Sequence, residues 1–468
     1  MANTLSISSS QDTAINDQSS PGWIAARLDR LEAWPYPPIV LMMVGITFFF
    51  AYFDISNIAT VLPSAMHEFH VGKEAAAVVV SLGLWGYIVG GLVTSVIADR
   101  MGRKQGFLLA AMLYGVGSVV NGLAWNFNIF AVARFVSGMG IGAALTVIST
   151  YMSEISPAKG RGRYMAWTTL PGLVGSALVP WLSFWLVPNF AHGWRVILVL
   201  PVVGTLFVLF WIKHFPESPR WLVAHGHARD AERIVAAAEA LARKKTGRAP
   251  APVLAPAQID VHSRGISIIF GRRLLPWTIL FFVIWFLNYL PIYGAISMGV
   301  TLLVDHGIPL QKSILLTIGY SIGIVLGGLV APWIADRMPR KWPAFIATVV
   351  LGISLILLGM YPSNTMIAIV YFLLAFQAGI FAPSVYLLTA EHFPTAGRAT
   401  GIAICNAVGH VGGAVAPFFI IGVYQSVGFA TTWTVLGIVI FALAIALLPT
   451  RNTTGVSLEA ISDATPAP

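Results

Sequence analysis

Twelve apolar runs follow one another along this chain, each about 20 residues long. A helix of that length crosses the roughly 30 Å of hydrocarbon in a bilayer. Composition agrees, because 57% of the residues are hydrophobic and only 10% are charged, whereas soluble domains typically carry about 25% charged residues. We therefore predict an all-α polytopic membrane protein. The predicted spans are 39–63, 75–98, 105–125, 128–153, 163–187, 193–212, 275–300, 311–335, 342–361, 365–390, 399–422 and 426–448.

Part of the sequence is repeated at a constant offset of 237 residues. Gly90–Lys104 and Gly327–Lys341 agree at eleven of fifteen positions, and Glu154–Arg161 matches Glu391–Arg398 at the same offset. Two matches at one offset indicate an internal repeat, so we predict two pseudo-symmetric six-helix bundles. The predicted domains are an N-terminal tail 1–36, a first bundle 37–212, a central loop 213–273, a second bundle 274–449 and a C-terminal tail 450–468.

Basic residues are distributed unevenly between the two sides of these spans. With the N-terminus placed inside, 24 of the 28 Lys and Arg fall on the cytoplasmic side, and the outer loops hold Lys73, Arg195 and Lys312. This bias sets membrane topology, so the net charge of +9 does not indicate a nucleic-acid partner. We expect both termini to be cytoplasmic, in a plasma membrane that is a bacterial inner membrane. No cleavable signal peptide is predicted, since the first 35 residues are polar.

Several motifs carry a resemblance to a known family. Asp99–Lys104 follows the second span and is echoed by Asp336–Lys341 after the eighth, and Arg134–Gly140 lies in the fourth span. With two six-helix halves and a long central loop, this pattern resembles the major facilitator superfamily. Pro216–Arg220 is similar to a loop of its sugar-porter-type members and their metabolite-transporting relatives. The resemblance implies alternating access, in which two bundles rock about a central site near the membrane midplane.

The repeated charge clusters predict a conformational latch. Glu154 and Glu391 end the fourth and tenth spans on the cytoplasmic side, which gives Arg103 and Arg340 acidic partners. We expect these pairs to form when the bundles close on that side. Alternatively, the clusters only satisfy the bias of basic residues toward the cytoplasm. The latch residues are Asp99, Arg100, Arg103, Glu154, Asp336, Arg337, Arg340 and Glu391.

Two charges inside apolar runs suggest coupling to protons. Asp54 is the only acidic residue well inside a span, and Arg134 is the only such basic residue. Each costs about 2.5–3.5 kcal/mol in hydrocarbon, and helix geometry places both at similar depth in the outer half. Resemblance to sugar-porter-like proton symporters implies that this Asp–Arg pair carries the coupling. A purely structural ion pair and a bond from Arg134 to an anionic substrate remain alternatives. His410 is a second proton site, a substrate contact or a packing residue.

The seventh span offers candidate substrate contacts. Asn288, Tyr289 and Tyr293 share one broad helix face that combines an amide with two rings. The paired glutamines of classical sugar porters are absent from this span, which leaves small organic acids, including aromatic ones, as open as sugars. The other candidate substrate contacts are Gln377, Asn406, Trp85, Tyr87 and Trp167.

No enzyme chemistry is indicated, because we find no metal-ligand spacing, no Ser/His/Asp set and no phosphate-binding loop. We therefore expect no metal and no cofactor. The predicted function is secondary transport, by proton-coupled import of a small organic metabolite such as an organic acid or a sugar. Its partners are then the substrate, the proton and the lipid bilayer, and the unit is a monomer. A proton-driven exporter and a facilitative uniporter remain the alternatives.

Overall fold

The structure is a computed structural model that describes residues 21–158, 160–250, 252–253, 265–335, 337–339 and 341–451. Every regular element in these residues is helical. The first half contains α3 (Pro38–Phe69), α4 (Lys73–Met101), α5 (Arg103–Leu123), α6 (Phe127–Ile155), α7 (Arg161–Asn189), α8 (Gly193–Val199), α9 (Val202–Trp211) and the short η1 (Ile212–His214). The second half contains α13 (Leu275–Asp305), α14 (Leu310–Ala335), α15 (Lys341–Met360), α16 (Asn364–His392) and α17 (Thr395–Leu447). Four smaller helices are α2 (Pro21–Asp29), α10 (Pro219–Ala224), α11 (Ala228–Thr246) and α12 (Gly265–Ile269).

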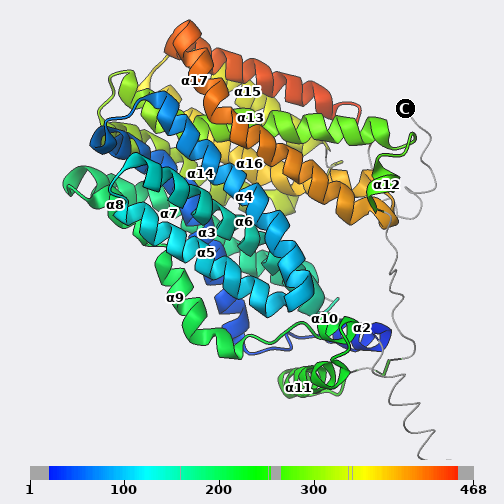
Figure 1. The fold of residues 1–468 in the computed structure, drawn as a ribbon. Helices are drawn as coiled ribbons and strands as arrows, with labels where there is room; N and C mark the ends of the chain where they lie inside the picture. The colour runs from blue at the N-terminus through cyan, green and yellow to red at the C-terminus, as the bar shows by residue number, and fades with distance from the viewer. Residues whose placement is uncertain are drawn as a thin grey trace, which may run out of the picture.

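Eleven helical stretches in the described residues are long and apolar enough to cross a membrane. The count differs from the twelve predicted spans because the last two join into α17. Gly428 interrupts α17 with φ 78° and ψ 179°, a left-handed φ that favours glycine. The chain reverses direction there, so the orange and red parts of α17 run antiparallel (Figure 1). The predicted architecture of two six-helix bundles is confirmed, with the break nearer 428 than 424.

Helices α4 and α6 approach each other closely at glycines. A Cβ atom at Gly86 would overlap the carbonyl oxygen of Phe135, and one at Gly90 would overlap that of Met139. Small residues four apart allow this approach of two backbones inside a membrane. Close packing of the first bundle therefore depends on residues with no side chain.

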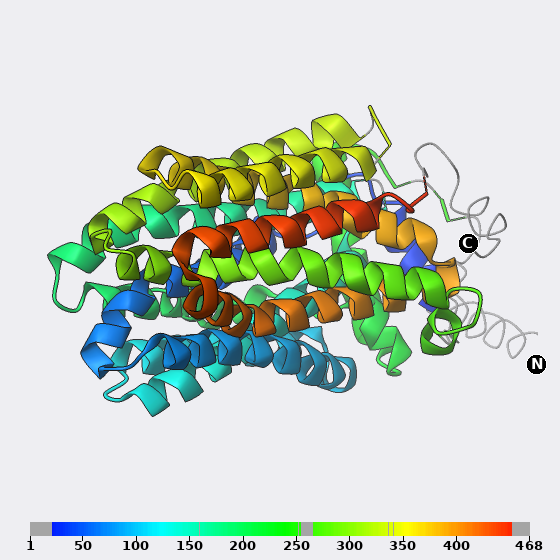
Figure 2. The ribbon, with the colours of Figure 1, turned by 90° about the horizontal axis from the view of Figure 1, so that it is seen from above.

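Helices α2, α10 and α11 pack together at one end of the first bundle (Figure 1), and we call them the platform. Arg27 of α2 pairs with Glu239 of α11 at 2.9 Å and with Glu232 at 2.6 Å. Helix α11 lies within the predicted central loop 213–273, and the docking of α2 onto it was not predicted from the sequence. The platform and the end of α17 lie on the same side of the molecule, on the right in Figure 2. We call this side the terminal face and the opposite side the far face.

The α4–α6 contact can be tested by adding one methyl group. We expect Gly90→Ala to lower the melting temperature of the purified protein, because overpacking costs about 1–3 kcal/mol. Gly422→Ala is the matched control, since a Cβ there meets nothing within 4 Å and both changes gain the helix propensity of alanine. Equal melting temperatures for the two variants would contradict the tight contact.

Candidate functional site

A cavity of about 740 Å³ lies between the two halves. Helices α3, α4, α6 and α7 line it from the first half, and α13, α14, α16 and α17 line it from the second. Its walls are mostly apolar, with hydroxyl groups distributed among them. The tyrosines that line it are Tyr52, Tyr87, Tyr289, Tyr293, Tyr320 and Tyr386. A concave, largely apolar site with a few polar groups is the usual form of a small-molecule site.

The predicted face of the seventh span does point into this cavity. Asn288, Tyr289 and Tyr293 of α13 all line it. Behind them, Gln377 Nε2 donates to Asn288 Oδ1 at 3.2 Å, and Tyr289 Oη donates to Asn406 Oδ1 at 3.2 Å. Gln377 and Asn406 are therefore positioned to orient cavity residues and do not line the cavity themselves. Within the described residues no hydrogen bond is made by the Asn288 NH₂ group, so this cavity-lining amide has a donor available to a substrate.

His410 lies at the centre of a group of rings. Its imidazole stacks on Tyr87 with a centroid separation of 4.2 Å, and Tyr289 meets it edge-on at 4.9 Å. Nδ1 lies 2.9 Å from the carbonyl oxygen of Asn406. Because a carbonyl can only accept, Nδ1 carries the hydrogen and Nε2 remains an acceptor. The stack joins α4 of one half to α17 of the other, so it spans the interface across which the halves would move.

The two predicted tryptophans occupy different places. Trp167 lines the cavity from α7 and is 63% exposed. Trp85 is 40% exposed and does not line the cavity. Two residues correspond to about 200° of helix rotation, so Trp85 faces away from the cavity that its neighbour Tyr87 lines. The structure therefore does not group Trp85 with the other candidates.

Asp54 and Arg134 meet in the interior of the first bundle. Arg134 Nη1 lies 3.2 Å from Asp54 Oδ2, and Nη2 donates to the backbone oxygen of Asp54 at 2.8 Å. Asn57 completes the group, since its Nδ2 donates to Asp54 Oδ1 at 2.9 Å. All three side chains are buried. Helix geometry predicted the pair, but nothing in the sequence distinguished Asn57 from other amides.

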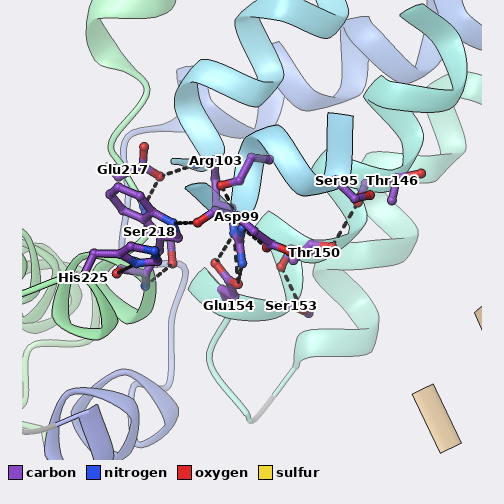
Figure 3. A network of polar contacts seen from close by, with 12 residues as sticks. Ser95, Asp99, Arg103, Thr146, Thr150, Ser153, Glu154, Glu217, Ser218 and His225 are labelled. Carbon is purple, nitrogen blue, oxygen red and sulfur yellow. Dashed lines mark hydrogen bonds and ion pairs between the residues drawn. The ribbon is translucent and has the colours of Figure 1, made fainter. Parts of the chain in front are cut away.

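A second charge network lies at the terminal face of the first bundle (Figure 3). Arg103 pairs with Asp99 at 2.5 Å and with Glu154 at 2.8 Å. Glu217 accepts hydrogen bonds from the backbone nitrogens of Arg103 and Lys104 at 2.8 and 3.1 Å, so it caps the start of α5. Burial raises the pKa of the Glu217 carboxyl, and these backbone hydrogen bonds act in the opposite direction. The sequence did not identify Glu217 as part of this network.

This network corrects one expectation about the latch. Arg103 and Glu154 belong to the same bundle, so their pair forms without closure between the halves. Arg100 is exposed, and Arg337 stacks on the ring of Trp333 at 3.8 Å. Glu391 is buried. The predicted partners Asp336 and Arg340 lie outside the described residues.

Within the described residues, the ion pair that joins the two halves lies instead at the far face. Lys73 Nζ lies 2.7 Å from Asp305 Oδ2, and Tyr424 Oη donates to the same oxygen at 2.6 Å. Gln425 also donates to Glu74. These bonds join the start of α4 to the end of α13 and to α17. We call these five residues the far-face cluster.

The cavity extends away from the far-face cluster. Its lining reaches Arg163 in the first turn of α7 and Ala331 near the end of α14, both toward the terminal face. The two halves are thus joined on the far side of the cavity, while the cavity continues toward the other side. This is the geometry of a site with access from one face at a time.

Comparison with known proteins places this arrangement in a family. The family described as "Sugar (and other) transporter" matches residues 38–464. A gallate transporter of Pseudomonas putida is 28% identical over 427 residues, which cover 90% of this chain and 93% of that one. The niacin transporter NiaP of Acinetobacter baylyi is 25% identical over 445 residues, with 94% and 99% covered. The xylose transporter XylE from E. coli, in an inward open conformation, superposes with a TM-score of 0.70 at 19% identity and covers 91% of this chain and 98% of its own.

We predict that Asp305→Asn loosens the far face, because it weakens the bonds to Lys73 and Tyr424. Exposed ion pairs contribute about 0.2–1 kcal/mol, so the open population should rise by about 1.4-fold to fivefold. Ser297 of α13 lines the cavity, and Cys405 is the single cysteine of the chain. The measurement is the rate at which an impermeant maleimide, added from the far face, labels Ser297→Cys in a Cys405→Ala background. Asp230→Asn, which removes an exposed pair on α11, should leave that rate unchanged. Equal rates for both variants would exclude a role of this cluster in closure.

Proposed function

This chain belongs to the family of sugar and other transporters within the major facilitator superfamily, and from that premise we propose that it imports a small organic acid together with a proton. The observation that carries the proposal is the buried Asp54–Arg134 pair, which lies in the bundle beside a ring-lined cavity between the halves. The chain is a transporter rather than an enzyme. The steps below concern its substrate, its coupling and its direction.

The charge and shape of the cavity support an organic acid. No Asp or Glu is present among the described residues that line it, and the only full charge there is Arg163. Rings form much of the wall, which suits a flat substrate. The related gallate and niacin transporters are named for carboxylic acids on a single aromatic ring. We therefore place a one-ring carboxylic acid ahead of a sugar.

Proton coupling follows from what protonation would do to the buried group. Arg134 is held by the Asp54 carboxylate and backbone, and Asn57 also bonds that carboxylate. A buried cation whose partner loses its charge is strongly destabilised. Protonation of Asp54 therefore releases Arg134 and weakens the contact between α3 and α6. This links one proton to the packing of the first bundle.

Alternation between two faces supplies the transport step. The far-face cluster closes one side of the cavity. For the cavity to open on that side, these bonds must break and the halves must close at the terminal face. We assign the terminal face to the cytoplasm from the bias of Lys and Arg toward that side. With this assignment, the cavity of the structure is open toward the cytoplasmic side and closed on the far side.

Uptake into proteoliposomes tests this function. A panel of benzoate, 4-hydroxybenzoate, gallate, nicotinate, xylose and glucose is offered with and without an inward proton gradient. We expect at least one aromatic carboxylate to accumulate above its external concentration only when the gradient is imposed. Accumulation of a sugar alone would reject the substrate class. Equilibration without accumulation would identify a uniporter, and accumulation driven by an outward gradient would identify an exporter-type antiporter.

Coupling is tested separately with Asp54→Asn. This variant cannot take up and release a proton at that position, so gradient-driven uptake of the identified substrate should fall to the level of equilibration. Exchange of labelled for unlabelled substrate at equal pH does not require that step, and part of it should survive. Gradient-driven accumulation that persists in Asp54→Asn would move the proton site to another residue.

A further inference from the structure

The cavity contains a cation that neither the sequence patterns nor the buried pair explains. Arg163 is in the first turn of α7 and is the only Lys, Arg, Asp or Glu among the described lining residues. Arg163 is exposed, and the walls of the cavity that it helps to line are mostly apolar side chains and rings. A charge with low-dielectric walls concentrates its field inside the cleft. The mouth of the cavity on the terminal face therefore attracts anions.

Arg163 has no acidic partner within the described chain, and it shares this with Arg337, whose guanidinium stacks on Trp333. Arg27, Arg103 and Arg220 form ion pairs with Glu239, Glu154 and Asp29, respectively. The Arg163 guanidinium instead rests over the ring of Tyr164, 5.4 Å from its centroid. Stacking leaves the N–H edges of the guanidinium available, and those edges fit a carboxylate with two parallel hydrogen bonds.

Trp167 lies one helical turn after Arg163. Residues four apart on a helix share a face, and both side chains line the cavity. The indole of Trp167 is 63% exposed, so its surface is open to a second ring. A guanidinium and an indole on one face match the carboxylate and the ring of an aromatic acid.

Arg163 lies too far from Tyr289 to share one small substrate with it. Arg163 is two residues from the terminal-face end of α7, about 3 Å along the helix, whereas Tyr289 is fourteen residues from that end of α13, about 21 Å. The difference in depth exceeds the length of a benzoate ion. The cavity therefore has room for two positions along its depth.

We propose that Arg163 and Trp167 form a second, anion-selective binding site for a one-ring aromatic carboxylate at the terminal-face mouth of the cavity. The proposal rests on the proposed transport of organic acids. It adds a second substrate-binding site between the central rings and the solution at the terminal face. Its occupant exchanges with the terminal-face solution first. The site therefore sets the apparent affinity measured from that face and has little effect on affinity measured from the far face.

The test compares benzoate with benzamide, which has the same ring without the charge. Binding is measured by calorimetry on the purified full-length protein, and benzoate transport is measured in membrane vesicles of both orientations. Arg163→Gln should raise the KM from the terminal face about fivefold to tenfold and leave the KM from the far face within about twofold. Arg163→Lys keeps the charge but not the paired hydrogen bonds, so it should restore part of the affinity. Trp167→Phe should weaken benzoate binding less than Arg163→Gln does.

Arg233→Gln is the matched control, because Arg233 is a basic residue of the exposed helix α11 and lies outside the cavity. It should bind and transport benzoate like the wild type. An Arg163→Gln variant that folds, transports benzoate and keeps its terminal-face KM would overturn the site while leaving the proposed function intact. If the wild type transports no aromatic acid, the proposed function fails, and benzoate binding then decides the site. Equal binding of benzoate and benzamide would also overturn it.

Discussion

The buried pair of Asp54 and Arg134 is the interaction that ties α3 to α6 inside the first bundle. Charges of this kind are costly away from water, and here the cost is offset by 2.8–3.2 Å contacts that include Asn57. Such a group is stable only while every member keeps its charge and position. Under the proposed coupling, protonation of the Asp54 carboxyl would weaken this contact between α3 and α6. The same bundle lines half of the cavity, so such a change would reach the substrate site.

The charges at the two faces have different structural effects. At the terminal face, Arg103 ties together helices of one bundle, whereas at the far face Lys73 and Asp305 tie one bundle to the other. Partly exposed pairs such as Lys73–Asp305 are weak, about 0.2–1 kcal/mol. Under the proposed alternating access, a weak tie suits a contact that breaks and re-forms in each cycle. The network around Arg103, in which Glu217 bonds the start of α5, would instead hold its own bundle together during that movement.

The sequence predicts those parts of the structure that follow from local physical rules. Apolar length predicted the spans, and counting depth along two helices predicted that Asp54 would meet Arg134. Helical periodicity also accounts for Trp85, because a residue about 200° away from Tyr87 cannot face the same cavity. The contact of Lys73 with Asp305 joins residues 232 apart, so it depends on how whole bundles are placed. Arg163 could not be recognised for the same reason, since its position in a cavity requires the second half of the chain.

An anionic substrate gives the proton a further physical role under the proposed function. Moving one elementary charge across a membrane potential changes its free energy by about 2.3 kcal/mol per 100 mV. An anion imported into a negative interior would be opposed by that amount. One proton carried with one carboxylate makes the moving charge zero, so the potential neither opposes nor drives the step. Such a carrier needs a proton site that is insulated from the substrate and a cation that holds the carboxylate after the proton has left. Asp54 is buried outside the cavity lining and Arg163 lies at its mouth, which is the separation that this division of roles requires.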